Sequence, residues 1–422
     1  MLLTIDIGTS TFKYAVWNYD GKRIFFSFVP LSFISDGIKC EIQPKEWLDV
    51  FKNCCQKAGN LSGVDVIIIS GNGPTLVPVE KDETLQVKAR LWMDRRAEKY
   101  QERVSEVMNG FVDASFFLPK VLYIKNEEEN LYNNTISFIG CPEYLAYKLT
   151  GELKTVFPSE GFERWFWNDK TLDRLNLDKD KFPVFINPGD RFGVITPPAA
   201  ESYGFKKDIP VIAGGPDFYS AILGSGVTEP GTACNRTGTS DGINLCTRDY
   251  VKHDFLMSYK HPVKPFWNLS GIIKETGKII ENSCVKNGIK SFDEYFKKAE
   301  KDESLKNVLE QIGFKIKDII NLMEGTGEYI NKLCVTGGLA DCTIFNQIKA
   351  DITGKPVIES IYREAELLGL FIIGACSLGR FSSSKEASSH LYKIKRCFEP
   401  DKNKNDLYNQ LYLEYKESRK DK

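Results

Sequence analysis

The amino-acid sequence predicts an α/β protein whose two domains begin with the same hairpin. Near the N-terminus, Gly8-Thr9-Ser10 joins two apolar, strand-like runs, and Gly238-Thr239-Ser240 does the same in the second half. Alternating strand-like and helix-like segments follow each hairpin, which is the pattern of α/β domains. At roughly 150 residues per domain, a chain of 422 residues has room for two or three domains. We therefore predict domains over 1–230 and 231–422, divided at a Glu-Pro-Gly turn.

The strands are predicted from short apolar runs. Residues 2–7, 12–17 and 23–29 alternate like strands around turn residues and predict a three-stranded antiparallel meander. Further strands are expected at 65–70, 210–215 and 332–338, the last two ending in glycines.

The helices are predicted from periodicity and from punctuation by proline and glycine. One follows residue 215, with Pro216 suited to the first helical position. Another carries Ile344, Ile348 and Ile352 on one face. Leu367–Gly379 is apolar enough for a buried helix, but far short of the roughly 20 residues that span a bilayer. A final amphipathic helix is expected with its apolar face on Leu407, Leu411 and Tyr415.

The composition argues against several classes of protein. Hydrophobic residues make up 42% and charged residues 27%, as in ordinary soluble globular proteins. The 56 basic and 57 acidic residues leave a net charge of −1, so no basic field attracts nucleic acid or an anionic membrane. The three histidines, His253, His261 and His390, share no metal-ligand spacing. A histidine metal centre and a histidine hydrolase triad are therefore not expected.

The cysteines and the N-terminus predict a cytoplasmic protein. Eleven cysteines occur without any C-x-x-C motif, and an odd, scattered set in a long chain is typical of reduced thiols. The first residues lack a basic segment and include Asp6, so no signal peptide is expected.

The two Gly-Thr-Ser turns are candidate phosphate-binding elements. Turns of small and hydroxyl residues direct backbone N–H groups and hydroxyls at an anion, and a facing pair would hold a polyphosphate from both sides. The alternative is that Gly-Thr-Ser is ordinary turn chemistry. Asp6 precedes the first turn inside an apolar run, where an unpaired carboxylate is costly. It is either a ligand of Mg²⁺ through water or a strand-end residue hydrogen-bonded within its turn.

Three further segments are candidates for chemistry. Asp217 begins a predicted helix, where it either complements the helix dipole or accepts a proton from a substrate hydroxyl during phosphoryl transfer. Gly337-Gly338 allows a ligand to approach the backbone closely. The segment Arg90–Arg96, with Trp92 and Asp94, forms either a grip for a polyhydroxylated ligand or a surface ion-pair cluster. The chain has neither G-x-G-x-x-G nor a P-loop motif.

Taken in order, these segments resemble the FGGY family of carbohydrate kinases, within the actin–hexokinase–Hsp70 superfamily. The resemblance covers essentially the whole chain and rests on six motifs in the family's order. They occupy residues 5–13, 70–97, 119–126 with 143–153, 193–226, 237–240 and 335–357.

The resemblance implies two ribonuclease H-like (actin-like ATPase) domains with a nucleotide cleft between them. It implies transfer of the γ-phosphate of ATP to a hydroxyl of a sugar or polyol, with a pentulose such as xylulose or ribulose favoured and a homodimer possible. Asp217 would be the general base, and Asp6 (through water) and Asp217 would hold Mg²⁺. The implied nucleotide-binding residues are Asp6, Gly8, Thr9, Ser10, Thr11, Lys13, Gly238, Thr239, Ser240, Gly337, Gly338 and Asn346. The implied substrate-binding residues are Asn72, Gly73, Trp92, Asp94 and Asp217.

The resemblance leaves the acceptor open. This chain has Gly73-Pro74 where glycerol kinases carry an Arg-Glu pair and xylulokinases a Met-His pair, so a hexulose, a deoxysugar or an aldonate stays open beside a pentulose. The stretch between Ser240 and Lys332 is shorter than in most family members. Two alternative functions also stay open. One is a non-catalytic sugar or nucleotide sensor of the same fold. The other is a superfamily ATPase, although the cysteines lack the cluster-binding pattern of ATPases that activate radical or dehydratase enzymes.

Overall fold

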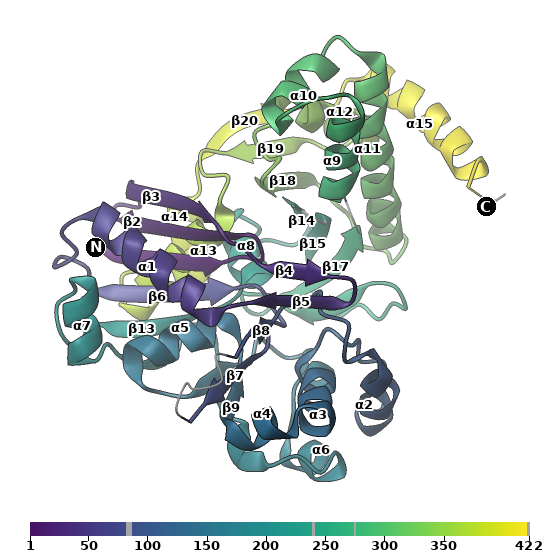
Figure 1. The fold of residues 1–422 in the computed structure, drawn as a ribbon. Helices are drawn as coiled ribbons and strands as arrows, with labels where there is room; N and C mark the ends of the chain where they lie inside the picture. Colours follow the sequence, from purple (N-terminus) through teal and green to yellow (C-terminus); the bar gives the residue numbers. More distant parts are fainter. Residues whose placement is uncertain (82–86, 239–240, 274–275, 420–422) are drawn as a thin grey trace. The chain divides into compact units, whose positions relative to one another are not determined.

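The computed structural model describes residues 1–81, 87–238, 241–273 and 276–419 (Figure 1). The chain forms two compact α/β units, and this confirms the predicted fold class. The first unit is Met1–Ser220 with Gly369–Ala387, and the second is Ala221–Leu368 with Ser388–Lys422. Residues 221–230 therefore group with the second unit, and a late segment returns to the first. The predicted domain bounds of 1–230 and 231–422 stay a prediction.

The first unit is built on a six-stranded sheet in the order β12-β13-β6-β1-β2-β3. Its strands are β1 (Leu2–Ile7), β2 (Thr11–Trp17), β3 (Arg23–Pro30), β6 (Val66–Gly71), β12 (Arg191–Val194) and β13 (Pro210–Pro216). The first three form the predicted antiparallel meander, which is confirmed. Strands β6 and β13 run parallel to β1, and β12 runs antiparallel to β13.

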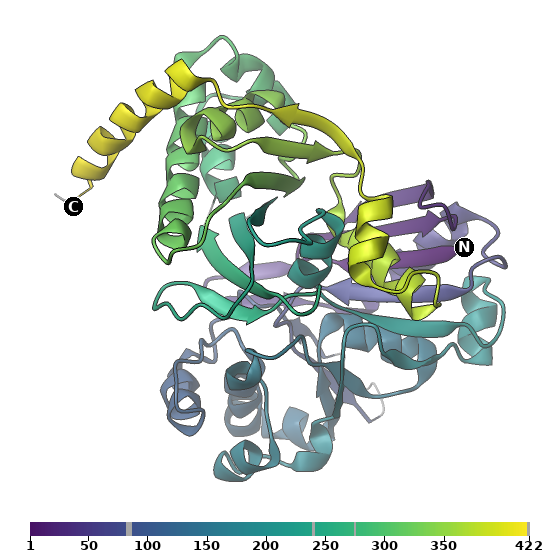
Figure 2. The same ribbon diagram turned by 180° about the vertical axis from the view of Figure 1, so that it is seen from behind.

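Helices cover both faces of this sheet (Figures 1 and 2). Helices α1 (Pro44–Ala58), α5 (Cys141–Thr150) and α7 (Pro197–Tyr203) lie on one face, and α13 (Ala365–Ser377) and α14 (Ser384–Leu391) on the other. The predicted buried helix is α13. It approaches the sheet closely at Gly374, where glycine has no side chain. A Cβ atom at this position would lie only 2.5 Å from Ile68 Cδ1. The rings of Phe371 and Trp17 add a contact with centroids 5.4 Å apart.

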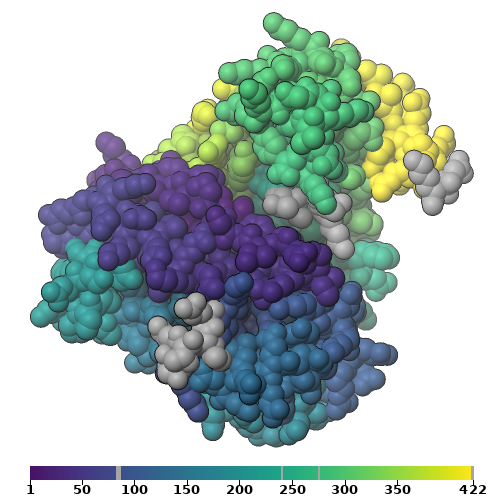
Figure 3. All heavy atoms as spheres, viewed as in Figure 1, coloured from purple at the N-terminus to yellow at the C-terminus, as the bar shows by residue number. Residues whose placement is uncertain are grey.

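Shorter elements complete the first unit. Its other strands are β4 (Ile34–Asp36), β5 (Lys39–Ile42), β7 (Val77–Glu80), β8 (Ala89–Arg90), β9 (Thr135–Ile139), β10 (Lys154–Val156) and β11 (Val184–Ile186). Its other helices are α2 (Gln101–Val107), α3 (Phe117–Glu127), α4 (Glu129–Asn134), α6 (Asp169–Arg174) and the 3₁₀ turns Glu98–Tyr100, Glu163–Trp165 and Lys179–Lys181. Figure 3 shows the β3–β5 segment, in purple, on the surface of this unit.

The second unit is built on a seven-stranded sheet in the order β16-β17-β15-β14-β18-β19-β20. Its strands are β14 (Thr232–Thr237), β15 (Asp241–Thr247), β16 (Met257–Lys260), β17 (Trp267–Ile273), β18 (Lys332–Gly337), β19 (Val357–Ser360) and β20 (Ile394–Phe398). The hairpin β14–β15 is followed by parallel strands β18 and β19 and an antiparallel β20. This is the arrangement of β1, β2, β6, β13 and β12, so the predicted internal repeat is confirmed.

The helices of the second unit pack largely through aliphatic residues. They are α9 (Thr276–Lys286), α10 (Phe292–Ala299), α11 (Glu303–Glu324), α12 (Thr343–Thr353) and α15 (Lys402–Glu417), with α8 (Asp217–Gly224) passing from one unit to the other. The predicted isoleucine face of α12 packs on α11, where a Cβ atom at Gly313 would lie 2.5 Å from Ile352 Cδ1. Among the described helices, none is long and apolar enough to cross a membrane.

Two local predictions are wrong at one residue each. Pro216 is the last residue of β13, and the helix begins at Asp217. On α15, Leu411 and Tyr415 pack against the core of the second unit as predicted, but Leu407 is 53% exposed, and Tyr408 and Tyr412 are the buried residues. The two tyrosines are buried against α11 because their hydroxyls donate to Glu310 and Asp318 on that helix, and a leucine side chain cannot make such hydrogen bonds.

The close approach of α13 predicts a large effect of Gly369→Ala. A Cβ atom there would lie 1.9 Å from the Ser220 carbonyl oxygen, within the first unit, so backbone must move. We expect a loss of about 1–3 kcal/mol in the free energy of unfolding, measured as a lower midpoint in thermal melting. Gly110→Ala is the control, because no atom lies within 4 Å of its added Cβ. Equal midpoints for the two variants would contradict the close packing.

Candidate functional site

The carboxyl ends of parallel strands β1, β6 and β13 bring the predicted residues of the first unit together. Asp6 pairs with Ser70, and Ser70 pairs with Gly215, so the three strands end level with one another. In α/β sheets, ligands bind outside the carboxyl ends of the strands. The Gly8 turn, Asn72 and Asp217 all follow this edge directly. We take the edge as the candidate site.

The first hairpin turn is held by its own backbone. Gly8 N–H donates to the Thr11 carbonyl at 2.8 Å, and a Cβ atom at Gly8 would lie 2.9 Å from that oxygen. Thr9 is half-buried and Ser10 is exposed. The Trp92 indole donates to Thr9 Oγ1 at 3.0 Å, which ties the predicted sugar-side segment to the predicted phosphate turn.

Asp6 is buried, and each of its carboxylate oxygens has a partner within the protein. Its side chain is 1% exposed, with Oδ1 accepting from Ser70 Oγ at 2.9 Å and Oδ2 lying 3.3 Å from Lys13 Nζ. Two strands therefore fix its carboxylate, rather than its own turn. A carboxylate has about four lone-pair sites, so a metal-bound water fits beside these partners. Within the part of the chain that the structure describes, no group of three or more His, Cys, Asp or Glu could hold a metal directly.

Asp217 begins α8 at the end of β13. Its Oδ1 accepts from Phe218 N–H at 2.6 Å, and the Phe218 ring stacks on Phe162 with centroids 5.6 Å apart. The backbone and the stacked ring therefore orient this half-buried carboxylate. Burial, together with the charges of Glu143, Asp6 and Asp217, raises the pKa of the Cys141 thiol well above its usual value. Asp6 and Asp217 thus lie near the same buried thiol.

The predicted acceptor residues fall into two groups. Asn72 is 4% exposed, and its amide donates to the Ile7 carbonyl at 2.9 Å and accepts from Thr75 Oγ1 at 2.5 Å. Asp94 is buried and accepts from Arg96 and from Cys40 N–H. Burial alone would raise its pKa, but these bonds outweigh burial and hold the pKa of Asp94 below its usual range.

By contrast, Trp92 is half-buried and Gly73 is exposed. The Trp92 ring and the Gly73 backbone can therefore contact a ligand directly. For Asn72 and Asp94, a contact with a ligand would have to compete with the hydrogen bonds that their side chains already make. Asn72 and Asp94 instead hold the backbone around them.

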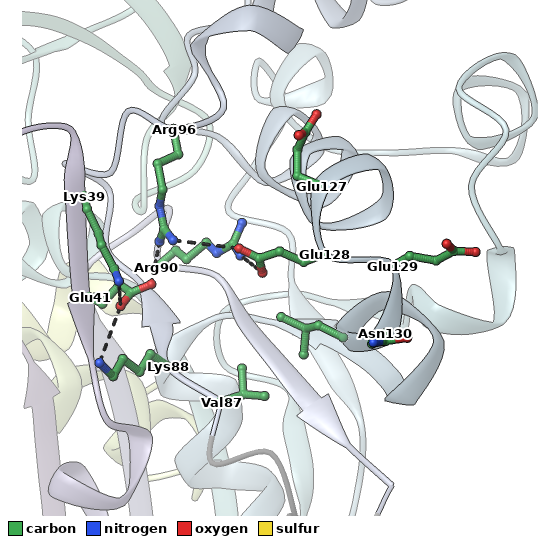
Figure 4. A pocket seen from close by; sticks show the side chains of 11 residues that line it. Lys39, Glu41, Val87, Lys88, Arg90, Arg96, Glu127, Glu128, Glu129 and Asn130 are labelled. Atoms are coloured by element: carbon green, nitrogen blue, oxygen red, sulfur yellow. Dashed lines mark hydrogen bonds and ion pairs between the residues drawn. The ribbon is translucent and has the colours of Figure 1, made fainter.

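A charged pocket of about 630 Å³ lies beside the acceptor segment in the first unit (Figure 4). Its lining residues are Lys39, Glu41, Val87, Lys88, Arg90, Arg96, Glu127, Glu128, Glu129, Asn130 and Leu131. Figure 4 shows Lys39 and Lys88 directed at Glu41, which also lies 2.7 Å from Arg96. Arg90 pairs with Glu128. Arg95 pairs with Asp113 at 2.5 Å. The arginines of the Arg90–Arg96 segment are therefore ion-paired, but the cluster does not lie wholly at the surface, because Arg90 is 3% exposed.

In the second unit, the predicted Gly337-Gly338 turn lies beside the end of β14. Gly338 N–H donates to the Thr237 carbonyl at 3.1 Å, and Leu339 N–H donates to Thr237 Oγ1 at 3.1 Å. Gly337 has φ +92°, and a Cβ atom there would lie 2.1 Å from the Thr237 oxygen. Gly238 follows β14 directly, so the structure brings Gly238, Gly337 and Gly338 to one edge. The predicted residues Thr239 and Ser240 lie outside the described residues.

Asn346 is buried on α12 near this turn. Its amide nitrogen donates to the Ala340 carbonyl at 2.7 Å, while its Oδ1 is buried without a hydrogen-bond partner among the described residues. One turn later, Lys349 is fully buried beside Asp241, and burial lowers its pKa to about 8. Lys349 was not among the predicted site residues, although a lysine within an apolar helical pattern is a signal that the sequence contains.

Three further residues outside the predicted set, Ser70, Cys141 and Lys120, support the site in the first unit. Ser70 donates to Asp6, and the Cys141 thiol lies 3.2 Å from the Asn72 carbonyl. Lys120 is fully buried and donates to the backbone beside the acceptor segment. Lys120 lies in the 119–126 motif, which was noted without a role.

Comparisons with known proteins agree with this arrangement. The model of the FGGY family of carbohydrate kinases matches over its N-terminal domain at residues 1–224 and over its C-terminal domain at residues 306–378. Xylulose kinase of Bacillus subtilis (strain 168) is 22% identical, covering 98% of this chain and 96% of its own. Two crystal structures from Lactobacillus acidophilus, of a ligand-bound xylulose kinase and of a gluconate kinase, each superpose on this chain with a TM-score of 0.84 at 18% identity. The xylulose kinase match covers 100% of this chain and 98% of its own. The gluconate kinase match covers 99% of this chain and 97% of its own.

The chain belongs to the FGGY family of carbohydrate kinases, and the resemblance found in the sequence is confirmed. It is a sugar kinase by family, with the two actin-like ATPase domains of that family, and kinases of this family use ATP.

The Thr237 contact predicts a loss of stability at one of two adjacent glycines and no change at the other. Gly337→Ala forces a side chain into backbone at a positive φ, so we expect the melting midpoint to fall by several degrees. Gly338→Ala meets no atom within 4 Å and should melt like the unchanged protein. Thermal melting of both variants without ligand tests this, and a Gly337→Ala midpoint equal to that of Gly338→Ala would refute it.

Proposed function

We propose that this kinase transfers the γ-phosphoryl group of ATP to a hydroxyl of a pentulose, such as xylulose or ribulose, with Asp217 as the general base. The observation that carries the proposal is the common edge of β1, β6 and β13. There the hairpin turn, Asp6 and Asp217 follow directly on strands that pair in register. One unit thus supplies a phosphate-binding turn and a carboxylate next to each other.

Asp217 is suited to accept a proton from a sugar hydroxyl. A general base must be ionised and must be held in one orientation. The N-terminus of α8 favours a negative charge, and Phe218 N–H binds Oδ1. As the hydroxyl oxygen attacks the γ-phosphorus, its proton passes to Asp217 and the bond to the leaving ADP oxygen breaks.

The first hairpin is suited to the phosphates. Backbone N–H groups of its turn, with the hydroxyls of Thr9, Ser10 and Thr11, offer donors to an anion, and Lys13 adds a positive charge. Asp6, between Ser70 and Lys13, would hold Mg²⁺ through water, with Asp217 as the second carboxylate at this edge. When bound, the ion would neutralise charge that develops on the phosphates.

The second unit is suited to the rest of the nucleotide. Gly338 leaves its backbone open, because no atom lies within 4 Å of an added Cβ. The buried Oδ1 of Asn346, without a partner among the described residues, is an acceptor that a bound nucleotide or an ordered water would satisfy. Gly238, Thr239 and Ser240 complete this proposed set.

The acceptor is proposed to lie against Trp92 and Gly73, with its reacting hydroxyl at Asp217. Asn72 and Asp94 would act by holding the backbone of this surface, since their polar atoms are already paired. A pentulose is favoured because relatives along the whole chain are xylulose kinases. We also propose that the enzyme is cytoplasmic and homodimeric, and that its ligands besides Mg-ATP are small sugars.

The test of this function is ADP release with Mg-ATP across a panel of pentuloses, hexuloses, polyols and aldonates. We expect turnover on a pentulose, and Asp217→Asn should lower kcat by about 10²–10⁴-fold. Asp169→Asn is the matched control, because Asp169 also begins a helix of the first unit and is exposed. It should retain full activity.

Two outcomes would count against the proposal. If Asp217→Asn keeps the kcat of the unchanged enzyme, Asp217 is not the base. If no sugar raises ADP release while calorimetry still detects sugar binding, the protein is a sensor of this fold and not a catalyst.

The role of Asp6 predicts a specific change in magnesium dependence. Asp6→Asn removes the charge that would hold the hydrated ion, so we expect the Mg²⁺ concentration for half-maximal activity to rise several-fold. Asp36→Asn, at the exposed end of β4, should leave it unchanged. Titration of activity with Mg²⁺ at saturating ATP distinguishes the two, and an unchanged midpoint for Asp6→Asn would remove Asp6 from the metal site.

A further inference from the structure

Lys120 is a fully buried lysine of α3 that the proposed reaction does not use. Its Nζ donates to the carbonyl oxygens of Pro74 and Leu91 at 2.8 Å each, and to that of Arg90 at 3.4 Å. A buried ammonium group is costly unless its protons meet acceptors. Here three protons meet three backbone carbonyls, so the lysine binds main chain rather than an acidic side chain.

The three carbonyls belong to the two segments that carry the acceptor residues. Pro74 follows Asn72-Gly73, and Leu91 directly precedes Trp92. The two segments also pair directly, because Leu76 and Arg90 exchange two backbone hydrogen bonds of 2.8 Å. Lys120 therefore joins them at the point where each leaves this pairing and runs towards the candidate site.

These contacts close a ring of hydrogen bonds through the first unit. Trp92 binds Thr9 of the hairpin, and Asn72 binds the carbonyl of Ile7 just before it. The path runs from the hairpin through Trp92 and Leu91 to Lys120, and returns through the Pro74 segment and Asn72. Without the ammonium group, the ring is closed on the side opposite the hairpin by the Leu76–Arg90 pair, which lies further from the hairpin along both segments.

We propose that Lys120 is a positioning residue for the acceptor sugar. It holds the Trp92 and Asn72 segments at a fixed separation without touching the sugar or ATP. This inference rests on the proposed kinase activity. Its signature is a loss in acceptor recognition with little change in the use of ATP, because the hairpin keeps its own backbone bond between Gly8 and Thr11.

The charged groups around Lys120 predict a pH dependence. Burial lowers the pKa of Lys120 to about 7, with Asp94 and Asp113 opposing this shift and Arg90 and Arg95 adding to it. Hydrogen bonds hold the pKa of both carboxyls below the usual range against burial, and guanidinium groups stay protonated. Burial raises the pKa of the neighbouring Cys40 thiol. Of these groups, Lys120 is the one that changes charge near neutral pH, and its neutral form turns a lone pair towards a carbonyl.

The first test compares Lys120→Met with Lys317→Met. Lys317 is a matched buried lysine of the second unit, which donates to the Ile352 carbonyl at 2.7 Å and to Asn409. We expect Lys120→Met to raise the acceptor KM by about 10- to 100-fold, with the ATP KM changed by less than about twofold. Lys317→Met should change neither KM. Equal acceptor KM values in Lys120→Met and the unchanged enzyme would overturn the inference, as would an equal rise in both KM values.

The second test needs no folded variant. The acceptor KM of the unchanged enzyme should rise as pH increases through about 7, while the ATP KM stays level. Where Lys120→Met folds, its acceptor KM should lack this step. A flat acceptor KM from about pH 6 to pH 9 would overturn the inference. Turnover by the unchanged enzyme is measured first, so an inactive enzyme counts against the proposed function and a flat profile against Lys120.

Discussion

The parallel pairing of β1, β6 and β13 is the constraint on which the rest of the first unit depends. Because these strands end level, three loops of distant sequence origin meet at one edge. The loops after β1 and β6 are tied to each other at their first residues, because the backbone N–H and the side-chain amide of Asn72 both donate to the Ile7 carbonyl. The third begins with Asp217, which the first turn of α8 orients. A slip of one residue would turn every one of these side chains to the opposite face.

The second unit repeats this constraint with a different solution. Its turn beside β14 is fixed by main chain packed on main chain, where Gly337 comes so close to Thr237 that no side chain fits. The first unit instead uses buried polar side chains, among them Asn72, Asp94 and Lys120. In the proposed enzyme, the first unit holds the phosphates and the acceptor beside a network of buried side chains, and the second unit holds the rest of the nucleotide beside a turn fixed by backbone contacts.

The strands and the repeat could be predicted from the sequence because both depend on local pattern. Alternation over 2–7 and 12–17 specifies the first hairpin, and glycines mark the ends of β13 and β18. The errors fall where tertiary contacts decide. The buried face of α15 follows the tyrosines that reach acidic partners on α11, and no pattern within the helix contains those partners. Lys120 was missed for the same reason, because its three acceptors lie in two other segments of the chain.

The same reasoning bears on how the acceptor is recognised. Prediction from motifs treats each polar residue near a site as a ligand contact, but Asn72 and Asp94 have their polar atoms occupied by the protein. In the proposed site, the sugar would instead meet the Trp92 ring, the exposed backbone at Gly73 and the carboxylate of Asp217. Specificity would then depend on the shape and spacing of that surface more than on a set of polar contacts. In the proposed enzyme, the acceptor surface would be set by the framework behind Gly73-Pro74, in which Lys120 would fix the distance between the two segments.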